Sequence, residues 1–230
     1  MHTTSHNDTS VGKGVPQHNL HPQPKSISRL HVITDDLNVI LQACAAGADW
    51  IQLRIKGQSM EVIEQTATSA LDICNSHGAT LIINDHVQLT KKIKAHGVHL
   101  GKNDMHPQEA REFLGPDCII GGTANIIEDI RAIQHHVNYI GLGPFRFTQT
   151  KQNLSPTLGL EGIEALSFGE GLGGVPIIAI GGITAADVYP LLETGVHGVA
   201  VSSAIAKADD IQQATRAFAR ACRDMPKTVT

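Results

Sequence analysis

One unit recurs along the chain from Ile27 onward: a short run rich in β-branched residues ends in polar residues, and a segment with helical spacing follows. The predicted strands cover residues 30–34, 50–55, 80–84, 98–100, 118–121, 139–142, 176–180 and 199–202. The predicted helices cover residues 36–46, 59–76, 86–95, 107–114, 126–136, 160–168, 185–194 and 208–222. Eight such units in 230 residues predict an α/β protein with a single (β/α)8 TIM barrel.

Glycines and turns support the barrel over its main competitor. Gly47, Gly78, Gly97 and Gly195 each stand between a predicted helix and the next strand, where a left-handed residue commonly ends a helix. An open doubly wound sheet is the competing fold, and it predicts a glycine-rich turn after the first strand. Residues 34–36 read TDD at that turn, so no G-x-G-x-x-G motif is present there.

Composition divides the chain and excludes several functions. Residues 1–26 are polar and predict a disordered tail, and residues 27–224 are the predicted barrel domain.

A net charge of −4 and 3% aromatic residues argue against nucleic-acid binding. No apolar run approaches the roughly 18 residues that a membrane helix requires. The four cysteines form no C-x-x-C pair and predict buried thiols in a reducing cytoplasm. The sequence is compatible with both a monomer and a homo-oligomer.

The second predicted strand carries cations on one face. Residues 50–56 read WIQLRIK, and side chains alternate between the two faces of a strand. Gln52, Arg54 and Lys56 are therefore expected to point into the barrel, with the intervening aliphatic residues toward the helices. An internal salt-bridge network with acids of neighbouring strands is one use of these cations. Two cations stepping toward the barrel mouth suit a polyanionic ligand better.

Carboxylates follow the next two predicted strands. Asn84 and Asp85 end the third strand, and Asp104 follows the fourth. Because the strand ends of a barrel meet at one rim, both carboxylates are expected to face Arg54 and Lys56. Two carboxylates completed by water and phosphate oxygens suit Mg²⁺, which predicts a Mg²⁺-pyrophosphate site. Two alternatives are open. One residue of Asn84 and Asp85 could be the N-cap of the next helix, or the two carboxylates could act as a general acid–base pair.

The sixth predicted strand opens into a long polar loop. Residues 141–151 read GLGPFRFTQTK and bring Thr148, Thr150 and Lys151 to the same rim. A lysine and two hydroxyls at the tip of such a loop suit the capture of an anion. An ordinary surface loop is the alternative.

The last two predicted strands end in a different chemistry. Gly181 and Gly182 follow the seventh strand, and Ser202 and Ser203 follow the eighth. Bare backbone N–H groups and a helix N-terminus at this place in a barrel commonly hold a phosphate monoester. The rim therefore has places for two phosphorylated groups. This predicts a transferase that expels pyrophosphate while a phosphorylated acceptor lies opposite.

These motifs resemble the thiamine phosphate synthase (thiamine-phosphate pyrophosphorylase) family over residues 30–206. The shared motifs are QLRIK at 52–56, ND at 84–85, GVHLG at 97–101, Asp104, GLGP at 141–144, the threonines and lysine of 148–151, IGGI at 180–183 and SAI at 203–205. The resemblance implies a TIM barrel and Mg²⁺. It also implies the condensation of hydroxymethylpyrimidine pyrophosphate with thiazole phosphate, giving thiamine phosphate and pyrophosphate by a dissociative mechanism.

The resemblance also assigns roles by position. The implied metal ligands are Asp85 and Asp104. The implied contacts to pyrophosphate or pyrimidine are Gln52, Arg54, Lys56, Asn84, Thr123 and Lys151, of which Arg54, Lys56, Thr123 and Lys151 are the predicted catalytic residues. Thr148 and Thr150 would cover the substrates, and Gly181, Gly182, Ser202 and Ser203 would surround the thiazole phosphate.

Several positions depart from the family pattern. Thr123 replaces a usual serine, Asn125 a usual histidine, and His86 a common second aspartate. Arg146 stands in an altered part of the polar loop, where a phosphate contact and a solvated side chain are both open.

Two other functions are weighed against the synthase. A thiazole tautomerase shares the barrel but has a histidine where this chain has Asn125, and it lacks an aspartate equivalent to Asp85. A non-catalytic phosphate-ligand-binding barrel would not need Asp85, Asp104 and Lys151 together. These differences favour the synthase.

Overall fold

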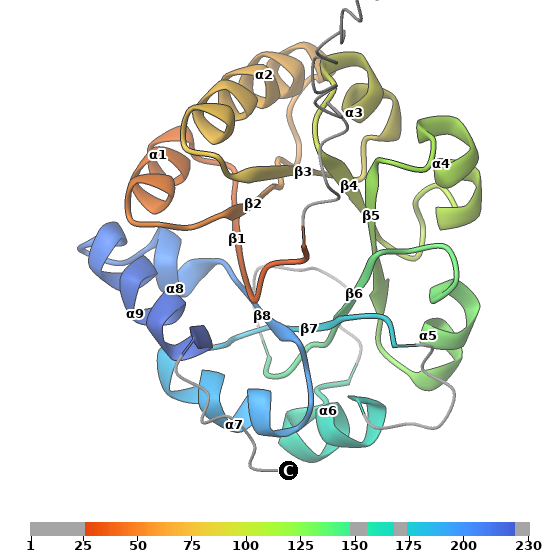
Figure 1. Ribbon diagram of the computed structural model, residues 1–230, viewed down its shortest axis with the longest axis vertical. Coiled ribbons are helices and arrows are strands. Elements are labelled where there is room, and N and C mark those ends of the chain that lie inside the picture. The colour runs from red at the N-terminus through yellow and green to blue at the C-terminus, as the bar shows by residue number, and fades with distance from the viewer. Residues whose placement is uncertain (1–25, 148–155, 168–173, 224–230) are drawn as a thin grey trace, which may run out of the picture.

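Eight parallel strands close into a barrel in chain order, so that β8 pairs with β1 (Figure 1). The computed structural model describes residues 26–147, 156–167 and 174–223. The strands are β1 Leu30–Thr34, β2 Trp50–Leu53, β3 Thr80–Asn84, β4 Gly97–Leu100, β5 Ile119–Ala124, β6 Tyr139–Leu142, β7 Ile177–Ile180 and β8 Gly198–Val201. This arrangement confirms the predicted TIM barrel. The predicted tail lies almost entirely outside the described residues.

Helices form a ring around the strands (Figure 1). They are α1 Leu37–Ala45, α2 Met60–Ser76, α3 Val87–Ile93, α4 Pro107–Leu114, α5 Ile127–Ile133, α6 Gly159–Ser167, α7 Val188–Glu193, α8 Ser203–Ala206 and α9 Ile211–Arg223, with the 3₁₀ turn η1 Ala185–Asp187 before α7. In the part of the chain that the structure describes, no helix has the length and apolar character needed to cross a bilayer.

Some predicted boundaries need correction. Strand β2 ends at Leu53 instead of residue 55, although the Arg54 amide still donates to the Thr34 carbonyl at 2.9 Å. The segment predicted as one helix over 185–194 is η1 followed by α7. A short helix, α8, also precedes the last predicted helix, which begins only at Ile211. These shifts leave the order of the elements unchanged.

The role predicted for Gly97 is wrong. Gly47, Gly78 and Gly195 do take positive φ angles between a helix and a strand, but Gly97 is the first residue of β4. Lys94 instead ends α3 in the left-handed conformation, with φ 56°. A Cβ atom at Gly97 would collide with the backbone of the neighbouring strand β5, so close strand packing explains this glycine.

Strand alternation separates two hydrophobic regions. Ile51 and Leu53 belong to the large cluster between strands and helices. Trp50 belongs to a smaller cluster inside the barrel, with Tyr139 and aliphatic residues of other strands. His31 stacks on Trp50 with ring centroids 4.4 Å apart, so aromatic rings fill part of the interior. The alternation therefore supports the inward orientation expected for Gln52, which is buried.

The buried His31 predicts a pH-dependent stability. Burial, assisted by the nearby His99, holds the pKa of His31 well below its usual value. Below the unfolded-state pKa of about 6.5, His31 is protonated in the unfolded chain but stays neutral in the folded protein. The free energy of unfolding therefore falls with pH by up to about 1.4 kcal/mol per pH unit. We expect His31→Phe, which keeps a ring against Trp50, to weaken this decline in urea unfolding between pH 7.5 and 5.5. An unchanged decline would contradict the assignment.

Candidate active site

A central cavity opens where the barrel strands end. The predicted site residues that line it are Arg54, Thr123, Gly181, Gly182, Ser202 and Ser203. They come from the ends of β2, β5, β7 and β8. The fold thus brings together residues up to about 150 positions apart in sequence, as the position of catalytic residues in barrels leads one to expect.

The β7 and β8 ends form one wall of this cavity. Gly181 and Gly182 have φ angles of 110° and 65°, which residues with side chains rarely adopt. Ser202 precedes α8, and Ser203 is its first residue. Amides in the first turn of a helix have no intrahelical acceptor and are available to a ligand. This wall offers backbone donors and hydroxyls, as a phosphate monoester requires.

The β2, β3 and β4 ends form a second cluster. Lys56 makes an ion pair with Asp85, whose backbone amide donates to the His99 carbonyl at 2.9 Å. Asp85 has φ 68°, a left-handed conformation uncommon for a residue with a side chain. The Asp104 carboxylate accepts a hydrogen bond from the Gly101 amide at 2.7 Å. Lys56 therefore pairs with an acid that follows the neighbouring strand, but its side chain is 55% exposed, so this is a rim pair and not an internal network, while Arg54 lines the central cavity.

The two carboxyl groups in this cluster interact. Partial burial alone would raise the pKa of Asp85, but Lys56 and the hydrogen bond with Asp104 together hold it below its usual value. Burial, and next the Asp85 carboxyl, raise the pKa of Asp104. Two carboxyls held this close to each other and to an ammonium make an oxygen donor set that fits Mg²⁺, whose other positions water and phosphate would fill.

Within the residues that the structure describes, no larger metal-binding group accompanies this pair. Among residues 26–147, 156–167 and 174–223, no group of three or more histidine, cysteine, aspartate or glutamate side chains could hold a metal. A zinc site of three or four side chains is therefore not formed by these residues.

Gln52 and Asn84 lie deeper than the sequence suggested. The Gln52 amide donates to the Asn84 side-chain oxygen at 3.0 Å, and both residues are buried. Neither is among the residues that line the central cavity. Their roles as substrate ligands stay predictions. The predicted contacts of Thr148, Thr150 and Lys151 lie outside the described residues.

Thr123 stands between the two parts of the rim. It lines the central cavity and also a neighbouring hollow that Asp104 and Lys102 line. Its hydroxyl lies 3.0 Å from His99 Nε2, and His99 Nδ1 lies 3.1 Å from the Tyr139 hydroxyl. Burial raises the pKa of Tyr139 far above its usual value, so the phenol stays protonated and can donate to Nδ1. His99 can then donate from Nε2 to orient Thr123.

Sequence reasoning gave no role to His99. Alternation along β4 could have found it, because every second residue of a barrel strand faces inward. A buried histidine beside a rim hydroxyl is then a candidate for orienting that hydroxyl.

The departures from the family pattern have structural partners. The Asn125 amide donates to the Gly143 carbonyl, which ties the end of β5 to the start of the polar loop. The Arg146 side chain is exposed, as one of the two options from the sequence has it, and it also makes an ion pair with Asp187. A phosphate contact of Arg146 stays a prediction.

Comparison with known proteins agrees with this rim chemistry. A family described as thiamine monophosphate synthase matches residues 27–205. The thiamine-phosphate synthase of Bacteroides fragilis is 48% identical over 179 residues, covering 76% of this chain and 87% of that protein. The thiamine-phosphate synthase of Flavobacterium johnsoniae is 49% identical over 190 residues, covering 80% of this chain and 88% of that protein.

A solved structure supports the same relationship. The thiamine phosphate pyrophosphorylase from Pyrococcus furiosus superposes with a TM-score of 0.76 and 28% identity, covering 84% of this chain and 95% of that one. The match of the family to most of the chain, together with these identities, leads to one assignment. The chain belongs to the thiamine monophosphate synthase family.

Proposed function

We propose that this protein condenses hydroxymethylpyrimidine pyrophosphate with thiazole phosphate, giving thiamine phosphate and pyrophosphate. Family membership supports thiamine phosphate synthesis as the activity. One structural observation carries the placement of the substrates. The carboxylate and lysine cluster of Asp85, Asp104 and Lys56 lies at the same rim as the Gly181 to Ser203 wall, and Thr123 lies between them.

The pyrophosphate is assigned to the cluster side. Asp85 and Asp104 would hold Mg²⁺, which supplies positive charge to the leaving pyrophosphate. Lys56 and Arg54 add fixed cations where negative charge develops, and such preorganised charge is a large part of catalysis. Thr123, oriented by His99, offers a hydroxyl to the same group. Lys151, Thr148 and Thr150 are proposed to join them from the polar loop.

The thiazole phosphate is assigned to the opposite wall. The amides of Gly181 and Gly182 and the hydroxyls of Ser202 and Ser203 would hold its phosphate. The bond from the pyrimidine methylene carbon to pyrophosphate breaks first, and the leaving oxygen takes the electron pair. The thiazole nitrogen then donates its lone pair to that carbon. Positioning and charge stabilisation suffice for this reaction, so no side-chain nucleophile is required.

A thiazole tautomerase fits the site less well. That reaction moves a proton and needs an acid–base group, for which a histidine would serve. Asn125 stands at that position here, and its amide is occupied by the Gly143 carbonyl. A carboxamide has no group that titrates near neutral pH, so Asn125 cannot serve as a general acid or base. The synthase is therefore the function that the site supports best.

Removal of the metal tests the proposal. With both substrates and Mg²⁺, we expect release of pyrophosphate, measured directly by ion chromatography, because a readout that needs an added Mg²⁺-dependent pyrophosphatase would itself fail in EDTA. EDTA is expected to lower the rate by at least about 100-fold, because the leaving group loses its strongest charge partner. Excess Mg²⁺ should restore the rate, and circular dichroism should show that the fold is unchanged. Release that continues at the full rate in EDTA would contradict the assigned metal.

The cellular setting is also a proposal. All four cysteines lie within the described residues, and none of them forms a disulfide there. This supports action in a reducing compartment, for which the cytoplasm is our assignment. Self-association into a homo-oligomer is left to measurement of the molecular mass in solution.

A further inference from the structure

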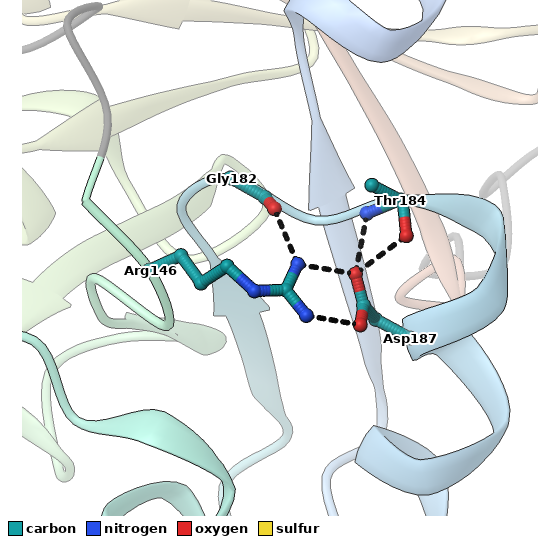
Figure 2. Close-up of polar contacts among 4 residues, drawn as sticks. All are labelled: Arg146, Gly182, Thr184 and Asp187. Atoms are coloured by element: carbon teal, nitrogen blue, oxygen red, sulfur yellow. Dashed lines mark hydrogen bonds and ion pairs between the residues drawn. The ribbon is translucent and has the colours of Figure 1, made fainter.

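Arg146 and Asp187 form a bidentate ion pair beside the phosphate wall, the wall of the central cavity made by Gly181, Gly182, Ser202 and Ser203. Arg146 follows β6, whereas Asp187 ends the η1 turn after β7. One guanidinium nitrogen donates to one Asp187 oxygen at 2.6 Å, and the other nitrogen donates to the second oxygen at 2.5 Å (Figure 2). The first nitrogen also donates to the Gly182 carbonyl at 3.0 Å. A planar fork of this kind fixes direction as well as distance.

Asp187 also holds the turn that follows the glycines. One of its oxygens accepts from the Thr184 amide at 2.8 Å and from the Thr184 hydroxyl at 2.6 Å (Figure 2). The Arg146 guanidinium, helped by the Thr184 hydrogen bonds, holds the pKa of Asp187 far below its usual value. Asp187 is therefore ionised at any working pH. It joins Thr184, Gly182 and Arg146 in one network.

The backbone of residues 144–146 lies directly against the glycines. The Phe145 amide donates to the Ile180 carbonyl at 2.8 Å, and the Arg146 amide donates to the Gly181 carbonyl at 2.9 Å. A Cβ atom at Gly182 would lie 2.9 Å from the Arg146 Cβ. A shift of Arg146 would therefore be transmitted to the Gly181–Gly182 peptide.

This bidentate pair stabilises the turn, and its partners point to a second role as well. The Arg146 side chain is 49% exposed and that of Asp187 is 14% exposed, so solvent screens part of their attraction. The guanidinium is already neutralised by Asp187, so it is poorly suited to act as the main counter-charge of a phosphate. The geometry suits a side chain that orients the phosphate wall instead.

We propose that Arg146 and Asp187 are positioning residues that hold the Gly181 and Gly182 amides in the orientation that binds the phosphate monoester of the thiazole substrate. This inference rests on the proposed function for the identity of the substrate. It goes beyond that function by naming the pair that sets the geometry of the phosphate wall.

The test separates the two substrates. Arg146→Ala is expected to raise the KM for thiazole phosphate about tenfold, because the phosphate donors lose their alignment. The KM for the pyrimidine pyrophosphate should stay within about twofold, since that substrate is assigned to the other side of the rim. Arg146→Lys should recover only part of the loss, because an ammonium cannot bind both carboxylate oxygens in the same fork.

A double-mutant cycle and a matched control complete the test. Asp187→Asn keeps an acceptor for Thr184 but loses the charge, and the Arg146→Ala/Asp187→Asn double variant should be no worse than the poorer single variant. Lys92→Ala removes an exposed ion pair with Glu64, between α3 and α2, and should leave both KM values unchanged. Equal increases in both KM values, or no increase for thiazole phosphate in Arg146→Ala, would overturn the inference.

Direct binding keeps this test independent of turnover. Calorimetric titration of thiazole phosphate into the wild-type protein and Arg146→Ala should show about tenfold weaker binding by the variant. If the wild-type protein makes no thiamine phosphate yet this difference appears, the proposed function fails and the inference stands. If the wild-type protein is active and both proteins bind thiazole phosphate equally, only the inference fails. Wild-type protein that does not bind thiazole phosphate overturns the inference.

Discussion

Asp85→Asn is expected to lower kcat for thiamine phosphate formation by about 1,000-fold, because the Mg²⁺ proposed to meet the leaving pyrophosphate would lose one of its two carboxylate ligands. This variant is well matched to the backbone. Asp85 has φ 68°, a conformation that asparagine tolerates better than most residues. The asparagine oxygen can still accept a hydrogen bond from Lys56.

Folding should change little in this variant. Its ion-pair partner Lys56 is 55% exposed, so the loss of the charge should alter the free energy of unfolding by less than about 1 kcal/mol. Asp72→Asn, an exposed carboxylate on α2, is the matched control and should keep full activity. Activity of Asp85→Asn within tenfold of the wild type, at saturating Mg²⁺, would remove Asp85 from the metal site.

Gly181→Ala is expected to lower kcat/KM for thiazole phosphate by about 100-fold, because the phosphate donors would be displaced by a fraction of an ångström or more. The added Cβ would lie 2.9 Å from the Pro144 Cα, a backbone atom that cannot move aside like a flexible side chain. The φ of 110° adds backbone strain. Steady-state kinetics with varied thiazole phosphate measure the effect.

Gly78→Ala separates strain from function. Gly78 has φ 69° between α2 and β3, and a Cβ there would meet no atom within 4 Å. It should lose about 1 kcal/mol of stability from backbone strain while keeping full activity. If Gly181→Ala lost no more activity than Gly78→Ala, the wall would not be the phosphate site.

Sequence patterns predicted the barrel because its signal is local and repeated. A short run rich in β-branched residues marks each strand, and the residue that follows a strand must lie at the rim. The predicted rim positions of Arg54, Thr123, Gly181 and Ser203 therefore required only the strand ends. The prediction for Gly97 failed because its cause is contact with Ile119 on the next strand, which local sequence does not reveal.

Pairings across the rim were the part that sequence could not predict. Lys56 meets Asp85 29 residues later, and Arg146 meets Asp187 41 residues later. Each cation had several acids within reach of a barrel rim, and only the three-dimensional register selects one. The hydrogen bond between Gln52 and Asn84 follows the same rule, since alternation predicts the inward direction of Gln52 but not its partner.

Formation of thiamine phosphate by the wild-type protein tests the central claim most directly. Purified protein is mixed with hydroxymethylpyrimidine pyrophosphate, thiazole phosphate and Mg²⁺, and the product is oxidised to fluorescent thiochrome. We predict fluorescence only when both substrates and Mg²⁺ are present, with one pyrophosphate released for each thiamine phosphate formed. Folded protein that gives no fluorescence with all three present would contradict the proposed function.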